Sequence, residues 1–317
     1  MISSCIFVAM NGLVVKTTGK HYTVKTTDGN IISCGLKGRF RIKGIKSTNP
    51  IVVGDIVHLI QDLSSWMITG LEERRNCIVR RSVNLSKQTH IIAANIDQAI
   101  LMITLDQPVT TTGFIDRFLI AANSNNIEVV LIFNKSDIYD KDKIKQKNLL
   151  LEIYRNIGYK VFSYSILRDD LSAIKSIMKN KISMISGHSG VGKSTLINKL
   201  QPSLNIKTKE VSSTHNQGQH TTTFSEIHDL DFGGSIIDTP GIKGFGLSEI
   251  EHNDLGSFFP EFVSFKQGCK YNNCIHKNEP DCEVKIAVQK GDIAKSRYEN
   301  YLNMLNDDSQ NYRVNNY

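Results

Sequence analysis

Hydrophobic and polar positions alternate in short stretches over the first part of the chain. Residues 10–72 contain apolar pairs and triplets separated by turn residues, a pattern typical of half-buried β-strands. Five strands are predicted, at Leu13–Val15, Tyr22–Val24, Ile31–Ile32, Ile56–Leu59 and Trp66–Ile68. Asp28-Gly29-Asn30 favours a hairpin turn between the second and third of them. Five strands with few helical signals predict a small OB-type β-barrel.

The middle of the chain has a different pattern, in which short apolar runs fit buried strands. These runs lie at residues 128–133, 161–164, 181–186 and 235–237. After the third run, Lys193–Leu200 places Leu196, Ile197 and Leu200 on one helical face, and Lys141–Lys147 opens an amphipathic helix with a solvated charged face. This region is therefore predicted to be an α/β domain.

The segment from Gly187 to Ser194 matches the phosphate-binding P-loop pattern. Its glycines allow tight turns, so that successive N–H groups can point at phosphate oxygens. Lys193 would reach the β- and γ-phosphates, and Ser194 would offer its hydroxyl to Mg²⁺. The alternative is a chance Gly-rich turn, which the strand–loop–helix context disfavours. The predicted nucleotide-binding residues here are Gly187, His188, Ser189, Gly190, Val191, Gly192, Lys193, Ser194 and Thr195.

A guanine-reading motif, Asn134-Lys135-Ser136-Asp137, follows the first apolar run. A carboxylate at Asp137 can accept from both N1–H and the N2 amino group of guanine, whereas adenine offers neither donor. Alone, these four residues could be a polar turn. A second base contact is predicted from the backbone at Ser165-Ile166, where Ile166 stands in place of the usual Ala.

The order of these two motifs is inverted relative to an ordinary GTPase, in which the P-loop opens the domain. Here Asn134–Asp137 precedes Gly187–Ser194. The inversion predicts a circularly permuted GTPase domain, and few protein families have that order.

The Mg²⁺ site and the switch are expected downstream of the P-loop. Asp238-Thr239-Pro240-Gly241 ends a strand, so that Asp238 would hold a water on Mg²⁺ and the Gly241 N–H would face the γ-phosphate. Thr222 or Thr223, in a polar stretch from Gln201, would complete the Mg²⁺ shell when GTP is bound. A plain strand start is the alternative for this Thr run.

The usual residue for orienting the catalytic water is absent from its expected position. Many GTPases place Gln directly after the Asp-x-x-Gly motif, but this chain has Ile242, which cannot hydrogen-bond to water. Either intrinsic hydrolysis is slow or another group acts, and His220 is the leading candidate for a catalytic residue. A solvated loop histidine is the alternative.

Near the C-terminus, three thiols and one imidazole fall within a short window. Cys269, Cys274, His276 and Cys282 have the composition of a closed tetrahedral zinc site, so one structural zinc is predicted. A disulfide with one free thiol, or fortuitous clustering, are the alternatives. A reducing compartment disfavours the disulfide.

Length and charge add two constraints. The 317 residues are enough for two or three domains, with no apolar run long enough to span a membrane and no convincing signal peptide. The net charge of +7 favours a polyanionic partner. Cations without an acid follow the third strand, with Phe40 as a stacking platform, and predict contact with RNA; a solvated basic loop is the alternative. They are Lys37, Arg39, Arg41, Lys43 and Lys46.

Together these motifs resemble the ribosome small subunit-dependent GTPase A family of bacterial ribosome-assembly factors. The resemblance also rests on Ser47-Thr48-Asn49-Pro50, on Val53-Gly54-Asp55 and on the helical tail Ile293–Tyr301. It implies an N-terminal OB barrel, a permuted GTPase domain and a C-terminal α-rich zinc domain. It also implies GTP hydrolysis stimulated by the small ribosomal subunit, rRNA binding, and a role in late subunit maturation.

The expected organisation is a barrel at 1–72, a basic interdomain linker at 73–90, the GTPase domain at 91–250 and the zinc domain at 251–317. We expect a cytoplasmic monomer that uses GTP or GDP, Mg²⁺ and Zn²⁺ and has no membrane partner. A P-loop kinase or ATPase would have no use for Asn134–Asp137. A GTP-dependent RNA-binding module with little intrinsic hydrolysis remains an alternative, because Ile242 removes the usual orienting side chain.

Overall fold

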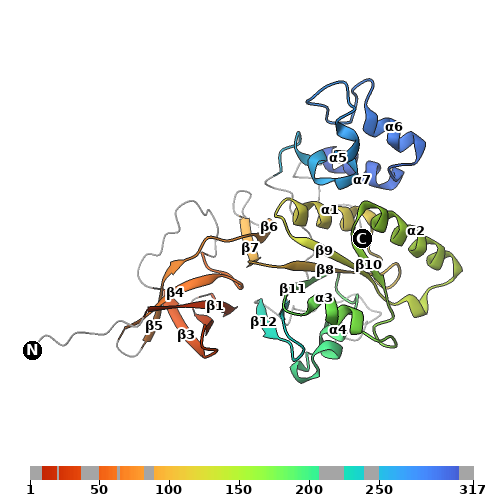
Figure 1. The fold of residues 1–317 in the computed structure, drawn as a ribbon. Helices are drawn as coiled ribbons and strands as arrows, with labels where there is room; N and C mark the ends of the chain where they lie inside the picture. The colour runs from red at the N-terminus through yellow and green to blue at the C-terminus, as the bar shows by residue number, and fades with distance from the viewer. Residues whose placement is uncertain are drawn as a thin grey trace, which may run out of the picture.

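The computed structural model describes residues 9–19, 21–36, 50–62, 65–81, 89–206, 225–238 and 250–306. They form three regions, which follow one another along the chain (Figure 1). A β-barrel comes first, drawn in red and orange. An α/β layer structure follows in yellow and green, and a small helical region in blue packs on top of it.

The barrel is built from five strands that close on themselves. These are β1 (Ala9–Thr17), β2 (Tyr22–Thr26), β3 (Ile31–Leu36), β4 (Ile56–Asp62) and β5 (Ser65–Leu71). Their order is β1-β2-β3-β5-β4, and β4 pairs back onto β1. Val14, Val24, Leu59 and Ile68 fill the interior. The predicted five-stranded barrel is therefore confirmed.

The hairpin predicted between the second and third strands is present. Thr26 N–H donates to Asn30 O at 2.9 Å, and Gly29 has a φ of +86°, which a side chain would strain. The basic stretch 37–46 lies outside the described residues.

The α/β region continues from the barrel in a single sheet of 11 strands. Its own strands have the order β10 (Lys160–Ser163), β9 (Glu128–Phe133), β8 (Gln98–Ile103), β11 (Ile182–Ser186), β13 (Ser235–Asp238) and β12 (Glu226–Asp229). All neighbours are parallel except β12, which runs antiparallel to β13. The four predicted strands and the predicted helix at 193–200 are confirmed within a residue or two at their ends.

Helices cover both faces of this sheet, which explains why β8 is buried along its whole length. On one face, α1 (Thr112–Asn123) and α2 (Lys141–Ile157) pack against Leu101, Ile103 and their neighbours. On the other face, α3 (Ser172–Met178) and α4 (Lys193–Leu200) pack against Ile100 and Met102. Successive residues of β8 thus belong to opposite cores.

A two-stranded ribbon, β6 (Cys77–Arg81) and β7 (Thr89–Ala94), connects the barrel to the α/β region. Val53 of the barrel forms an isolated bridge with Ala93. Gly54 approaches so closely that a Cβ there would lie 2.0 Å from Ala94 O. The segment predicted as a linker therefore contains strand β6 and the start of β7, and the close contact between the two regions lies just beyond it.

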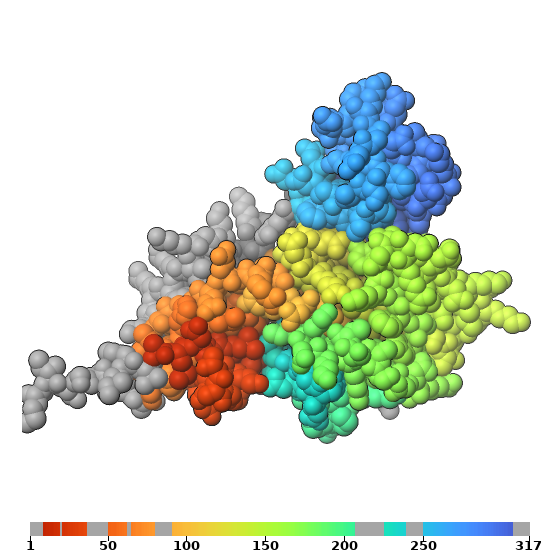
Figure 2. Space-filling model, viewed as in Figure 1, coloured from red at the N-terminus to blue at the C-terminus, as the bar shows by residue number. Residues whose placement is uncertain are grey.

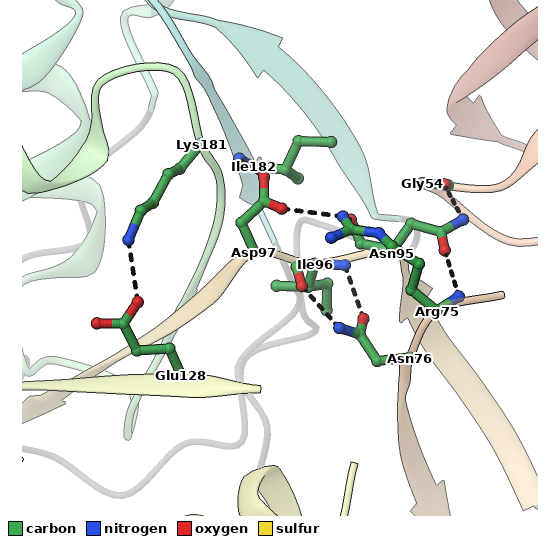
Figure 3. A network of polar contacts seen from close by, with 9 residues as sticks. All are labelled: Gly54, Arg75, Asn76, Asn95, Ile96, Asp97, Glu128, Lys181 and Ile182. Carbon is green, nitrogen blue, oxygen red and sulfur yellow. Dashed lines mark hydrogen bonds and ion pairs between the residues drawn. The ribbon is translucent and has the colours of Figure 1, made fainter. Parts of the chain in front are cut away.

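Polar side chains hold this junction (Figure 3). Asn95 donates to Gly54 O at 2.9 Å and accepts from Arg75 N–H at 2.9 Å. Arg75 also pairs with Asp97 at 2.9 Å, whose other oxygen accepts from Ile182 N–H of β11 at 2.8 Å. The barrel is thereby bonded to the central strand of the α/β sheet.

Arg74, another cation of the predicted linker, faces inward. Its guanidinium binds both oxygens of the buried Asp55 at 2.7 Å and donates to Pro50 O at 3.0 Å. Because this charge is paired inside the protein, Arg74 is not available to RNA.

The C-terminal region consists of η3 (Leu255–Phe258), α5 (Pro260–Lys266), α6 (Glu283–Lys290) and α7 (Lys295–Asn306). Phe259, Phe262 and Tyr301 pack together at its centre, with ring centroids 4.8 to 5.3 Å apart; the two phenylalanines stack and the tyrosine meets both edge-on. It sits on α1 (Figure 2). Two short 3₁₀ turns, η1 (Ser136–Ile138) and η2 (Pro202–Leu204), complete the described elements. Among these residues, no helix combines the length and apolar character needed to cross a membrane.

Candidate functional site

The predicted P-loop lies between β11 and α4, at the carboxyl edge of the parallel sheet. Gly187, Gly190 and Gly192 have φ angles of 141°, 85° and 101°. A Cβ on Gly187 would lie 2.6 Å from Met102 O, and one on Gly192 would lie 2.5 Å from Asn134 Nδ2. Side chains at these two positions would push the loop away from the neighbouring strands. The glycines therefore permit both the turn and its close packing.

Lys193, at the first position of α4, folds back onto the loop that precedes it. Its Nζ donates to Gly187 O at 2.8 Å and to His188 O at 2.7 Å. Burial lowers the pKa of Lys193 to about 8, and nearby Asp238 partly opposes that shift. A largely buried cation with two carbonyl partners can be further stabilised by an anion, which suits a polyphosphate site.

This lowered pKa predicts a pH dependence of nucleotide binding. Phosphates should raise the pKa of Lys193, so binding takes up a proton, and affinity is full below pH 8 and falls above it. We expect GDP affinity at pH 9 to be lower than at pH 7.5 by about eightfold. Isothermal titration over this range measures it. Lys193→Arg, which stays charged, should remove the decline; a flat wild-type profile would contradict the assignment.

Asp238 ends β13 beside the P-loop lysine. Burial raises the pKa of its carboxyl group, and the nearby charges of His228 and Lys193 partly oppose this. Glu226, its register partner on β12, pushes the pKa up further. A cation bound nearby would stabilise the ionised form of this carboxyl group. Ser194 and Thr195 follow Lys193 in the first turn of α4.

Asn134 joins three segments that are far apart in sequence. Its side-chain amide donates to Val191 O of the P-loop at 2.8 Å, and its Oδ1 accepts from Ile166 N–H at 3.1 Å. The Asn134 side chain is buried. Thus the residues predicted to read the base lie against those predicted to bind phosphate, despite their inverted order.

Asp137 and Lys135 lie at the turn that follows Asn134. The Asp137 side chain is 15% exposed, and the Nε of Arg168 lies 3.5 Å from its carboxylate. Lys135 has a φ of +62° and donates through Nζ to Gln107 O at 2.5 Å. Ser136 N–H donates to Tyr164 O at 3.3 Å, which fixes the turn to the next loop. These bonds fix the turn that carries the Asp137 carboxylate.

The segment predicted to give the second base contact is held within the protein. Ser165 N–H donates to Asp169 at 2.7 Å, and Ile166 N–H donates to Asn134. The Ser165 hydroxyl is buried without a hydrogen-bond partner among the described residues. A base contact through this backbone stays a prediction.

Sequence reasoning missed the side chains that support this edge. Lys199 of α4 donates to Ile166 O at 2.7 Å and to Asp169 O at 2.8 Å, which holds the loop after β10. Tyr139 OH donates to Asn134 O at 2.6 Å and accepts from Leu105 N–H at 2.8 Å. In the sequence, Lys199 has the features of a solvated helix cation, and nothing there marks its carbonyl partners.

The switch residues fall outside the stretches of the chain that the structure describes. These are His220, Thr222, Thr223, Gly241 and Ile242. Their assigned roles stay predictions.

The four predicted zinc ligands converge in the C-terminal region. The ligand atoms of Cys269, Cys274, His276 and Cys282 all lie within 4.8 Å of one another. His276 Nδ1 is 3.7, 3.4 and 3.4 Å from the three sulfurs, and Cys269 Sγ is 3.9 Å from Cys282 Sγ. Zinc bonds of about 2.3 Å to sulfur and about 2.0 Å to nitrogen require S–N and S–S separations of about 3.5 and 3.8 Å in a tetrahedron. The donor set fits zinc.

The loop around these ligands is fixed by hydrogen bonds. Glu279 accepts from the N–H groups of Ile275, Lys277 and Asn278 at 2.6, 2.8 and 3.0 Å. Tyr298 OH donates to His276 O at 2.7 Å. Burial raises the pKa of the Cys274 and Cys282 thiols, so a cation is needed to keep them as thiolates.

Comparisons with known proteins decide the family. The family model described as RsgA GTPase matches residues 71–248, and the RsgA N-terminal domain model matches residues 11–65. The chain belongs to the RsgA GTPase family. A relative from Flavobacterium johnsoniae, named small ribosomal subunit biogenesis GTPase RsgA, is 52% identical over 96% of this chain and 95% of its own length. One of that name from Flavobacterium psychrophilum is 51% identical with the same coverage.

Solved structures agree with the fold. YjeQ from Thermotoga maritima has a TM-score of 0.76 and 34% identity, covering 94% of this chain and 98% of its own. YloQ, described as a circularly permuted GTPase, has a TM-score of 0.71 and 28% identity, covering 98% of both chains. The predicted family and the predicted permuted fold are confirmed.

Proposed function

We propose that the chain binds the small ribosomal subunit and hydrolyses GTP to GDP and phosphate during late maturation of that subunit. The hydrogen bond from Asn134 to Val191 O carries the nucleotide aspect of this proposal, because it joins base-reading and phosphate-binding segments into one site. The names of the relatives, small ribosomal subunit biogenesis GTPase RsgA, support the ribosomal aspect.

Within the site, each residue has a defined role. Asp137 selects guanine, with Asn134, Lys135 and Ser136 holding the turn. The amides of the P-loop and Lys193 bind the phosphates. Ser194 and one of Thr222 or Thr223 would hold Mg²⁺, and Asp238 would hold a water on it; the ion neutralises phosphate charge when bound. Asp238 is suited to this role because it is a partly buried carboxylate whose desolvation is only partly opposed by nearby positive charges.

The remaining residues complete the organisation. Cys269, Cys274, His276 and Cys282 would hold one structural zinc, with no ligand position left open for chemistry. We propose the domain boundaries 1–72, 73–90, 91–250 and 251–317, rRNA contact through the barrel, a monomeric state and a cytoplasmic location, where bacterial small subunits mature.

Turnover depends on the group that orients water, for which His220 is our candidate. GTP should order the switch and favour subunit binding, and the subunit must tighten GTP binding by the same factor. We expect subunits to bind more tightly with a non-hydrolysable GTP analogue than with GDP. Added small subunits should raise turnover at least about tenfold, roughly 1.4 kcal/mol of barrier, and large subunits should not. Phosphate release with each subunit in parallel measures this.

The matched variant is His220→Ala, which should lose most of the stimulation and keep GTP affinity. Stimulation equal to wild type would remove His220 from the mechanism. Turnover that stays low with either subunit would instead favour a GTP-dependent RNA-binding module with little hydrolysis.

A further inference from the structure

Helix α1 lies between the α/β sheet and the C-terminal region (Figure 1). At its start, the ring of Phe114 packs against the ring of His188 in the P-loop, with centroids 4.2 Å apart and planes 36° apart. The loop that leads into α1 carries Gln107, whose carbonyl accepts from Lys135. α1 and this loop therefore contact both the phosphate-binding and the base-reading segments.

The opposite side of α1 is bonded to the C-terminal region through a buried carboxylate. Asp116 is fully buried and accepts from Arg297 at 2.6 Å, Asn300 at 2.6 Å and Tyr154 OH at 2.7 Å. Arg297 lies on α7, 181 residues away in sequence, and is 1% exposed. One side chain of α1 thus receives hydrogen bonds from two residues of α7.

The Arg297 guanidinium forms ion pairs with two carboxylates. Besides Asp116, its Nε and NH2 donate to Glu261 of α5 at 2.7 and 3.1 Å. Its guanidinium also lies over the ring of Phe259, 4.6 Å from the centroid. Each bond has a defined direction, so the network is satisfied in only one relative placement of α1, α5 and α7. Buried ion networks add little net stability, and conformational specificity is their better-attested use.

A second contact sets the far end of α1. Asn123 donates to Phe258 O of η3 at 3.0 Å and to Tyr159 OH at 2.8 Å. Asp116 and Asn123 lie two turns apart, so α1 is fixed at two points along its length. A helix held in this way cannot rotate or slide without breaking one of the two attachments.

We propose that Asp116 and Arg297 are positioning residues for nucleotide binding: through them the C-terminal region holds α1, and α1 holds the P-loop by the contact of Phe114 with His188. This inference rests on the proposed nucleotide site. Coupling is reciprocal, so bound nucleotide should in turn hold the C-terminal region against α1.

The experiment replaces the cation by an apolar side chain of similar length in the full chain. We expect Arg297→Met to weaken GDP binding about tenfold, measured by titration with a fluorescent GDP, while the protein keeps its wild-type zinc content. Arg297→Lys, which keeps the charge, should recover some of the affinity. The matched control is Lys295→Met on the same helix, whose side chain is 81% exposed and should leave affinity unchanged.

A double-mutant cycle separates positioning from a general loss of stability. Phe114→Ala should weaken GDP binding by about as much as Arg297→Met, about tenfold, without disturbing Arg297. Once it is present, Arg297→Met should have little further effect, because the connection is already cut. Additive effects of the two changes would overturn the proposal.

Further results of the same measurements also test the positioning proposal. A zinc-loaded Arg297→Met protein that binds GDP as wild type does would overturn it. If Arg297→Met fails to fold, Asp116→Asn, which keeps the size and one acceptor, is judged by the same affinity and zinc measurements. Wild-type protein that does not bind GDP would instead refute the nucleotide site itself, so the two failures are distinguishable.

Discussion

Asp137→Asn should reduce GTP affinity by about a hundredfold or more, about 2.7 kcal/mol, and should favour xanthosine triphosphate. Guanine presents two donors, N1–H and the N2 amino group, to the two oxygens of the carboxylate. An asparagine turns one of those acceptors into a donor, which then faces the N2 amino group. Xanthine has a carbonyl at that position and restores the pairing. Because the side chain of Asp137 is only 15% exposed, water does not readily compensate the mismatch.

Titration of the variant with GTP, GDP and the xanthosine nucleotides measures the change in base preference. Asp142→Asn is the matched control, because it makes the same chemical change at an exposed position in the first turn of α2. GTP affinity left intact in Asp137→Asn would show that another residue reads the base. Loss of affinity for both bases, with normal folding, would indicate a structural role in the turn.

The local segments of the site could be predicted because each is encoded by adjacent residues. Gly187–Ser194 and Asn134–Asp137 carry their own chemistry, and both follow apolar runs that form parallel strands. The carboxyl ends of parallel strands meet at one edge of a sheet. Their convergence at Asn134 follows from these two facts, whatever the order along the chain.

The supporting contacts could not be predicted in the same way. Arg74 and Arg297 are charged, and charged residues are mostly exposed, so sequence alone places them in solvent. Both are buried because distant acids, Asp55 and Asp116, meet them. Strand β6 was missed for a related reason: its short apolar stretch lies among cations, and it forms a strand only by pairing with β7.

The permuted connectivity attaches the C-terminal region to the nucleotide site in two ways. The chain passes from Asp238 at the end of β13 into this region, and the buried Asp116–Arg297 pair fastens it to α1. The barrel is attached independently, through Gly54, Asn95 and Asp97 (Figure 3). Both flanking regions are therefore bonded to elements next to the proposed nucleotide site: α1 contacts the P-loop through Phe114 and His188, and β11 leads into that loop.

Cys274→Ser should abolish zinc binding and loosen the C-terminal helices. Loss of a single outer hydrogen-bond partner lowers metal affinity by about 10- to 100-fold, so loss of one of four direct ligands should lower it further. Cys274 is buried with Cys282 in the same core as Phe262 and Tyr301, and metal binding in such a site contributes directly to folding. We expect one zinc per wild-type chain, none in the variant, and a partial loss of helical circular dichroism.

Elemental analysis, circular dichroism and limited proteolysis provide the measurements, with Cys77→Ser on the β6–β7 ribbon as the matched control. If zinc holds the region that fixes α1, as we propose, Cys274→Ser should also weaken GDP binding by about as much as Arg297→Met, about tenfold or roughly 1.4 kcal/mol. The barrel and the α/β sheet have their own cores and should stay folded. Wild-type protein that is metal-free and yet has a stable C-terminal region would contradict the zinc assignment. If the variant loses zinc but keeps its GDP affinity, the assignment of a structural zinc would stand. The proposed effect of that zinc on nucleotide binding would be refuted.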